Sequence, residues 1–181
     1  MGGPENRLAD GSAAATPATL FARLDELGIG HRTVEHPPVF TVEEAKAVRD
    51  RLAGGHTKNL FLRNKKGEMW LVVCLEDRLI DLKALARHLG AGRFSFGSAD
   101  RLMRFLGVNP GAVTPFAIIN DRRRTVRVVV DLGVLQFGKV NFHPLDNAMT
   151  TTIASADLVK FLRAEQHAPE ITDLGALEHE V

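Results

Sequence analysis

Lys58 is the residue of this sequence best placed to do chemistry, because a flexible stretch meets an apolar one at that point. The pair Gly54-Gly55 precedes it and the run Leu60-Phe61-Leu62 follows it. Glycines allow positive φ or a close approach to a ligand, and the apolar run is typical of a core strand. A cation on the first residue of such a strand would be held in place to meet a ligand. The alternative is an ordinary solvated lysine at a strand edge.

A stiff loop over residues 107–115 is the second candidate. It holds Gly107, Pro110, Gly111 and Pro115 within nine residues. Prolines fix φ, and Gly111 can offer its backbone groups to a small ligand without an intervening side chain. The loop is therefore predicted to wall a small pocket. A plain helix-to-strand connection with ordinary turn residues is the alternative.

His143 is the third candidate, in the stretch Asn141-Phe142-His143-Pro144. The proline restricts the histidine to extended backbone conformations, so its side chain can be held as a hydrogen-bond donor of a pocket. It can equally be a structural histidine that bonds a backbone carbonyl.

Covalent and metal chemistry find no support in the sequence. Cys74 lies in the apolar run 71–75 and is predicted to be inert core. Nothing around it or around His56 matches the nucleophile motifs of hydrolases. The seven histidines lack the spacings of zinc sites, so we expect no metal and no cofactor.

Two basic runs, Arg122-Arg123-Arg124 and Lys65-Lys66, fall in predicted hairpin turns. Basic side chains on turns contact phosphates in many nucleic-acid-binding proteins, without reading sequence. The alternative for both runs is ordinary solvated charge.

The composition of the chain limits the kinds of protein and ligand that fit these candidate residues. The 181 residues are 45% hydrophobic and 25% charged, which is ordinary for one globular domain, and the net charge is only +1. Any contact with a polyanion must then be local. A single cysteine, the lack of an apolar signal core and the lack of a long apolar run favour a cytoplasmic protein without a membrane segment.

The predicted elements form one domain over residues 16–166, between a disordered lead (1–15) and a loosely ordered acidic tail (167–181). Helices are expected after the caps Thr16, Thr41, Ser98 and Ser155, with Glu44 completing a capping box at Thr41, and a further helix is expected over residues 81–89. Strands are expected at 31–35, 58–63, 68–75, 93–96, 116–120, 126–131, 138–141 and 150–154. Because helices and strands do not alternate regularly, the predicted fold is α/β with a mixed, strongly curved sheet or partial barrel and surrounding helices.

Four stretches together resemble the prolyl-tRNA editing domain family: residues 36–45, 58–62, 107–116 and 142–147, in that order within residues 16–166. The loop Pro110-Gly-Ala-Val-Thr-Pro115 and the stretch that begins at Phe142 look most like its free-standing alanyl-specific branch. The resemblance implies the mixed barrel-like fold and hydrolysis of a mischarged aminoacyl ester on proline tRNA. It implies tRNA as partner, with prolyl-tRNA synthetase as a second candidate.

The resemblance also assigns residues. The family's lysine falls on Lys58, its Gly-x-x-x-Pro motif on residues 111–115 and its pocket histidine on His143, so Lys58, Gly111 and His143 are the expected catalytic positions. Lys58 would hold the terminal phosphate or ribose, the 2′-OH of the substrate would activate the water, and N–H groups near Gly111 would stabilise the oxyanion. The remaining expected substrate contacts are Asn59, Ala112, Val113, Thr114 and Pro115.

Alternatives to an alanyl-specific enzyme stay open at this stage. A relative with cysteinyl specificity is one alternative, although the free-standing cysteinyl-specific branch looks less similar in the loop 110–115 and in the stretch that begins at Phe142. A non-catalytic module that binds the 3′ end of tRNA or another nucleotide would share the pocket, since a fold does not settle function.

Overall fold

The computed structural model describes residues 6–38 and 42–177. The strands are β1 (His31–Glu35), β2 (Gly55–Arg63), β3 (Met69–Leu75), β4 (Ser95–Phe96), β5 (Val126–Asp131), β6 (Lys139–Phe142), β7 (Met149–Ala154) and β8 (Glu170–Thr172). The helices are α1 (Pro17–Glu26), α2 (Val42–Arg49), α3 (Leu82–His88), α4 (Ala99–Leu106), α5 (Leu132–Leu135), α6 (Ser155–Ala164) and α7 (Leu174–Leu177). Two short 3₁₀ helices, η1 (Pro110–Ala112) and η2 (Pro115–Asn120), follow α4.

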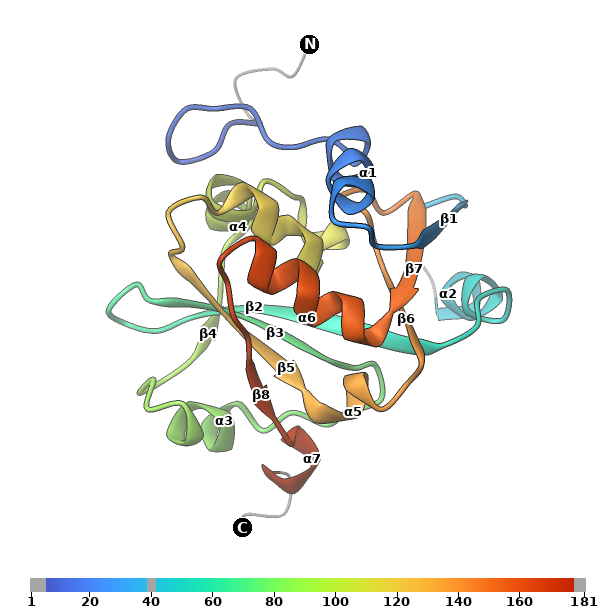
Figure 1. Cartoon of the computed structure of the whole chain (residues 1–181). Helices are drawn as coiled ribbons and strands as arrows, with labels where there is room; N and C mark the ends of the chain where they lie inside the picture. The colour runs from blue at the N-terminus through green and yellow to red at the C-terminus, as the bar shows by residue number, and fades with distance from the viewer. Residues whose placement is uncertain (1–5, 39–41, 178–181) are drawn as a thin grey trace.

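All eight strands belong to one mixed sheet, ordered β1-β7-β6-β2-β3-β5-β8, with β4 also paired to β2 (Figure 1). Parallel pairs join β6 to β2, β3 to β5 and β5 to β8, and the other pairs are antiparallel. The sheet is strongly curved and unclosed, so the predicted mixed α/β architecture is confirmed.

The central strand β3 is buried on both faces because its alternate side chains enter two separate cores. Leu71 and Val73 join the larger core, which α1, α4, η2 and α6 cover. Trp70 and Val72 join the smaller core under α3 and α7. A strand in this position needs a continuous apolar run instead of alternation, which the sequence of β3 supplies.

Local signals predicted most elements correctly. Thr16, Asp81 and Ser98 each accept a hydrogen bond from a backbone N–H in the first turn of the helix they precede. Gly28 and Gly107 adopt positive φ directly after α1 and α4, as expected of helix-terminating glycines. The expected capping residue Thr41 lies outside the described residues.

Two element predictions are wrong. The apolar run 116–120, expected as a strand, lies in the 3₁₀ helix η2. Thr114 and Pro115 start this turn, since the Thr114 hydroxyl accepts from the Phe116 N–H and proline suits the first helical position. Ser155 is the first residue of α6 instead of its cap, and Ala154 precedes the helix without a side-chain hydrogen bond.

Both ends of the chain differ from the expected disordered lead and loose tail wherever the structure describes them. In residues 6–15, Leu8 is buried and the Ala9 N–H donates to the Arg104 carbonyl of α4. In residues 167–177, β8 extends the sheet beside β5, and Leu174 is buried in the smaller core. Isolated apolar residues among polar ones carry too little periodicity to reveal such packing from sequence.

A buried hydrogen bond between His167 and Asp121 ties the end of α6 to the turn before β5. His167 Nε2 lies 2.9 Å from Asp121 Oδ2, both side chains are 3% exposed, and His167 Nδ1 donates to the Glu165 carbonyl. Burial raises the pKa of Asp121, but its hydrogen bonds with His167, Thr125 and Val126 outweigh burial and hold that pKa below the ordinary value of 3.8. The pair should therefore stabilise the fold at neutral pH.

We predict that Asp121→Asn lowers the free energy of unfolding by about 3 kcal/mol, because it removes the buried carboxylate that binds His167, Thr125 and Val126. Because the folded pKa of Asp121 is depressed, this contribution is complete above about pH 4 and is lost as the pH falls through the folded value. Urea unfolding at pH 7 and pH 3 measures both effects. Asp25→Asn, which removes an exposed partner of His31, should cost less than about 1 kcal/mol; equal losses would contradict the assignment.

Candidate active site

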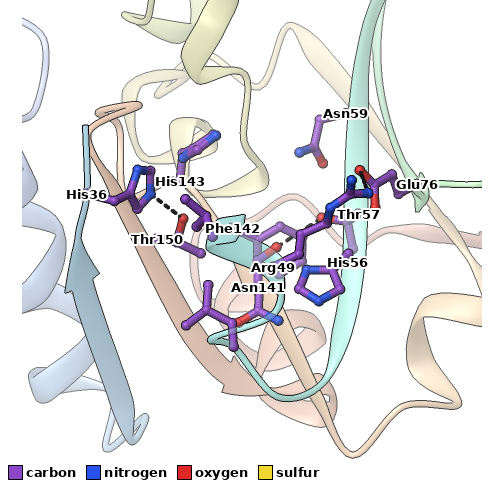
Figure 2. A pocket seen from close by; sticks show the side chains of 12 residues that line it. His36, Arg49, His56, Thr57, Asn59, Glu76, Asn141, Phe142, His143 and Thr150 are labelled. Carbon is purple, nitrogen blue, oxygen red and sulfur yellow. Dashed lines mark hydrogen bonds and ion pairs between the residues drawn. The ribbon is translucent and has the colours of Figure 1, made fainter. Parts of the chain in front are cut away.

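A cavity of about 160 Å³ lies between α2 and the face formed by β2, β6 and β7 (Figure 2). Most of the residues that line it have polar or titratable side chains, which distinguishes it from the apolar cores. The side chains include His36, Arg49, His56, Thr57, Asn59, Glu76, Asn141, His143 and Thr150.

Two histidines form one end of this cavity, with ring centroids 6.2 Å apart. His143 Nδ1 lies 2.8 Å from the Met149 carbonyl, and because a carbonyl oxygen only accepts, Nδ1 carries a proton. His36 Nδ1 likewise donates to the Pro37 carbonyl, and in the neutral ring its Nε2 accepts from the Thr150 hydroxyl at 2.8 Å. Among the described residues, only His143 of this pair keeps its Nε2 without a partner.

His143 therefore bonds a backbone carbonyl, which is the structural alternative from the sequence, and it presents an acceptor to the cavity instead of the donor that the sequence also allowed. Burial lowers the pKa of His143 below its ordinary value of 6.5, and the bond to Met149 offsets this only in part. The nearby His36 lowers the pKa further. At neutral pH the ring is uncharged, and its Nε2 lone pair is available to a ligand or a water molecule.

Asn59 supplies a second acceptor at the other end of the cavity (Figure 2). Its amide Nδ2 donates to the Val113 carbonyl at 3.1 Å, which fixes the orientation of the amide. Its Oδ1 is buried and has no hydrogen-bond partner in the described part of the chain. A buried acceptor without a donor costs free energy, so a ligand donor at this oxygen would be favourable.

An ion pair closes one side of the cavity. Arg49 at the end of α2 lies 2.6 Å from Glu76, which follows β3. The pair holds α2 against the turn after β3, so two remote segments together define the entrance.

Lys58 does not line this cavity. It is the fourth residue of β2 and not the first, because the strand begins at Gly55. Side chains alternate along a strand, so Asn59 faces the cavity while Lys58 points to the opposite face, where its Nζ donates to the Arg78 carbonyl. The alternative of a solvated edge lysine is also wrong, since Lys58 is only partly exposed and carries this bond.

The glycines before Lys58 serve packing between strands. Gly54 has φ +96°, and a Cβ there would lie 2.5 Å from the Lys139 carbonyl. A Cβ on Gly55 would lie 2.8 Å from the ring of Phe137. Only glycine lets the start of β2 approach β6 this closely, which explains the pair without a ligand.

The loop 111–115 reaches the cavity only through the Val113 carbonyl that Asn59 binds. Ala112, Thr114 and Pro115 are buried, and Gly111 is exposed beside Asn147 in a neighbouring hollow of about 520 Å³. The structure therefore unites Asn59 and His143 in one pocket but leaves Lys58 and Gly111 outside it.

Cys74 is buried, and burial raises the pKa of its thiol to about 12. The predicted inert core role of this cysteine agrees with that environment. Across the described ranges, His, Cys, Asp and Glu side chains nowhere form a group of three that could hold a metal ion.

A family model for the aminoacyl-tRNA editing domain matches residues 36–161, which contain every residue of the cavity. The chain belongs to the aminoacyl-tRNA editing domain family. The expected family and enzyme class, an aminoacyl-tRNA deacylase, are thereby confirmed.

Two relatives resemble this editing domain over most of their length. The prolyl-tRNA editing protein ProX of Acetoanaerobium sticklandii is 40% identical over 146 residues, which cover 80% of this chain and 89% of the relative. The prolyl-tRNA synthetase associated domain-containing protein 1 of Danio rerio is 40% identical over 167 residues, which cover 89% and 91%.

The fold of the editing domain also matches a solved structure of a candidate trans-editing enzyme for prolyl tRNA synthetase. The TM-score is 0.67 at 17% identity, and the match covers 89% of this chain and 98% of the other. At this identity the likeness bears on the fold alone. Among the residues that the structure describes, none of the helices combines the length and the apolar character needed to cross a bilayer.

The two basic runs of the editing domain lie away from the cavity. Lys65 and Lys66 are exposed at the tip of the β2–β3 hairpin, and Arg122, Arg123 and Arg124 are exposed in the turn before β5. From His56 in the cavity to Asn64 at the tip, β2 spans about 26 Å at ~3.3 Å per residue. Figure 1 shows this hairpin tip and α2 at opposite ends of the sheet.

Sequence reasoning missed His36, Arg49, Glu76 and Thr150 as parts of the site. The His36-Pro37-Pro38 break gave a local signal for the first of them. Arg49 and Glu76 meet only because α2 packs over the sheet, and no spacing in the sequence reports that contact.

We predict that the pKa of His143 lies below 6.5 and that its neutral ring carries the proton on Nδ1. NMR titration of the ring nitrogens, assigned with His143→Gln, measures both. Because the folded pKa is lowered, the unfolded chain binds more protons, and the fold loses stability as the pH falls below about 6.5. A pKa above 6.5, or a proton on Nε2 of the neutral ring, would contradict the acceptor role.

Proposed function

We propose that this chain is a trans-acting deacylase that hydrolyses the ester of alanyl-tRNA(Pro). In this proposal it works in the cytoplasm on tRNA that prolyl-tRNA synthetase has mischarged. The observation that carries the proposal is the cavity with two acceptors, Asn59 Oδ1 and His143 Nε2, that no donor of the described residues satisfies. It lies in a domain of the editing family whose relatives are named for prolyl-tRNA editing.

The terminal residue of an aminoacyl-tRNA offers donors that complement these acceptors. Its α-ammonium group and its ribose 2′-OH both donate hydrogen bonds. We place the ammonium at Asn59 Oδ1, where a buried acceptor gains most from a charged donor, and the reacting ester between Asn59 and His143.

His143 is the proposed general base. Its neutral Nε2 takes a proton from water while the water oxygen attacks the ester carbonyl carbon. The bond from that carbon to the ribose 3′ oxygen then breaks, and His143 returns the proton to the leaving oxygen. Free alanine and tRNA with a 3′-OH result. The alternative base is the 2′-OH of the substrate, which would leave His143 to orient it.

Lys58 and Gly111 need different roles from those that the family resemblance implies. Lys58 Nζ holds the Arg78 carbonyl two residues after Glu76, so it fixes the turn that presents Glu76 to Arg49. We propose that it is a positioning residue for the entrance of the cavity. Gly111 lies in the neighbouring hollow, and we assign it no chemical step.

We predict that His143→Ala lowers kcat for alanyl-tRNA(Pro) by about 10²- to 10⁴-fold, the range for loss of a general base. His88→Ala is the matched control, because His88 is an exposed histidine of α3 outside the cavity. If the wild-type protein binds tRNA but the alanyl ester is hydrolysed no faster than in buffer alone, the protein is a binding module instead of an enzyme. A wild-type rate in His143→Ala would favour the 2′-OH as base.

The same assay distinguishes two roles for Lys58, one as a positioning residue that acts through Glu76 and one as a residue that contacts the substrate. If it acts through Glu76, Lys58→Met and Glu76→Gln should each slow deacylation, and the double variant should be no slower than the slower single variant. Losses that multiply would show that Lys58 acts on the substrate directly.

We predict that glycyl, alanyl and seryl esters on tRNA(Pro) are removed and that prolyl esters are refused. A cavity of about 160 Å³ must hold the ammonium, the ester and the side chain, which leaves room for a small group only. Excess bulk is rejected sterically, whereas a hydroxyl or a missing methyl is worth only about 1–3 kcal/mol. Initial rates on one tRNA carrying glycine, alanine, serine, cysteine or proline measure this. Preference for cysteine would establish the cysteinyl alternative, and efficient removal of proline would refute the editing role.

A further inference from the structure

A second hollow of about 350 Å³ lies directly beside the candidate active site, between β1, β6, β7 and the segment after α2. Leu52 lines both hollows. Three basic side chains from three different elements line the second one: Arg32 of β1, Arg51 after α2, and Lys139 of β6.

Strand register links one of these basic residues, Arg32, to residues that line the active site. Arg32 pairs with Thr152, Thr152 with Asn141, and Asn141 with His56. Arg32 and Thr152 line the basic hollow, whereas Asn141 and His56 line the cavity, so this row of paired residues runs from the hollow to the cavity. Lys139, which lines the hollow, lies two residues before Asn141, and His143, which lines the cavity, lies two residues after it.

The three cations lack acidic partners among the described residues. No hydrogen bond or ion pair joins Arg32, Arg51 or Lys139 to another side chain there, and all three are exposed. Asp157 is the one carboxylate in the lining, and His31 already binds Asp25 at 2.9 Å. By contrast, Arg23, Arg49 and Arg127 each pair with a glutamate.

We infer that Arg32, Arg51 and Lys139 bind backbone phosphates of the tRNA acceptor strand whose 3′ end enters the cavity. This inference rests on the proposed function for the identity of the ligand. Lys139 lies four residues from His143, about 13 Å along the strand. With one phosphate per ~3.4 Å of helix axis on each strand, that is about four nucleotides.

The geometry favours this hollow over the two basic runs seen in the sequence. Arg122 to Arg124 and Lys65-Lys66 lie toward the far end of the sheet, so a strand that ends in the cavity meets the hollow first. Since the net charge of the chain is only +1, three uncompensated cations beside the site are a substantial local attraction.

The test compares two triple variants with the same change in charge: Arg32→Gln/Arg51→Gln/Lys139→Gln, and Arg122→Gln/Arg123→Gln/Arg124→Gln as control. Binding of uncharged tRNA(Pro) is measured between 50 and 200 mM NaCl, as experimental settings. Loss of three phosphate contacts should reduce the slope of log K against log salt by about 2 to 3. We expect the first variant to show this reduction and the control to keep the wild-type slope.

Deacylation gives a second readout on two substrates, alanyl-tRNA(Pro) and alanyl-adenosine ester, which lacks the acceptor strand. The first variant should lose at least tenfold in kcat/KM on the tRNA and keep its rate on the small ester.

A wild-type salt slope in the first variant, or equal loss on both substrates, would overturn the inference. If the wild-type protein binds tRNA without hydrolysis, the proposed function fails while the salt slopes still decide whether this surface binds the acceptor strand. Equal urea midpoints confirm that both variants are folded.

Discussion

The buried amide of Asn141 is the interaction on which the arrangement of the site depends. It is 5% exposed, donates to the Ala53 and Gly55 carbonyls at 3.0 and 3.2 Å, and accepts from the Thr152 hydroxyl. β6 and β2 pair through only two register positions, so this amide supplements a short ladder. A buried polar group that is fully satisfied makes such a junction specific, because losing any partner leaves an unpaired group in a low-dielectric interior.

That junction also sets which side chains of β2 face the cavity. Once Gly54 and Gly55 are packed against β6, the alternation of β2 directs Thr57 and Asn59 to one face and Lys58 to the other. A shift by one residue would exchange the two faces completely. The position of Asn59, and hence its unpaired oxygen, follows from the close approach of two backbones several residues away.

The sequence predicted the parts of the fold that local chemistry determines. Caps such as Ser98 and turn glycines such as Gly67 act within a few residues, and both lie where expected. The run 116–120 was misassigned because a short apolar segment fits a buried strand and a buried turn equally well. Its 3₁₀ conformation depends on packing against α4 and the larger core, which the sequence does not report.

The same distinction between local and tertiary determinants explains which residues of the candidate site the sequence predicted. His143 and Asn59 were found because each belongs to a recognisable stretch of sequence. The role of Lys58 was missed because its partner, the Arg78 carbonyl, lies 20 residues further along the chain, and no local pattern reports that contact. The contacts of Arg49 with Glu76 and of His36 with Thr150 join segments far apart in the chain, so only the tertiary fold reveals them.

The separation of acceptors from cations has a physical reason in the proposed reaction. An aminoacyl-tRNA end carries a positive ammonium and a negative backbone, and these need opposite environments. Unpaired cations within the cavity would repel the ammonium, whereas Lys139, about 13 Å along the strand from His143, lies beyond the Debye length of ~8 Å at physiological ionic strength. Neutral acceptors at Asn59 and His143, with the unpaired cations in the adjoining hollow, can therefore bind both ends of one ligand without conflict. Lys58 fits the same rule, since it is engaged on the opposite face of β2 and adds no charge to the lining.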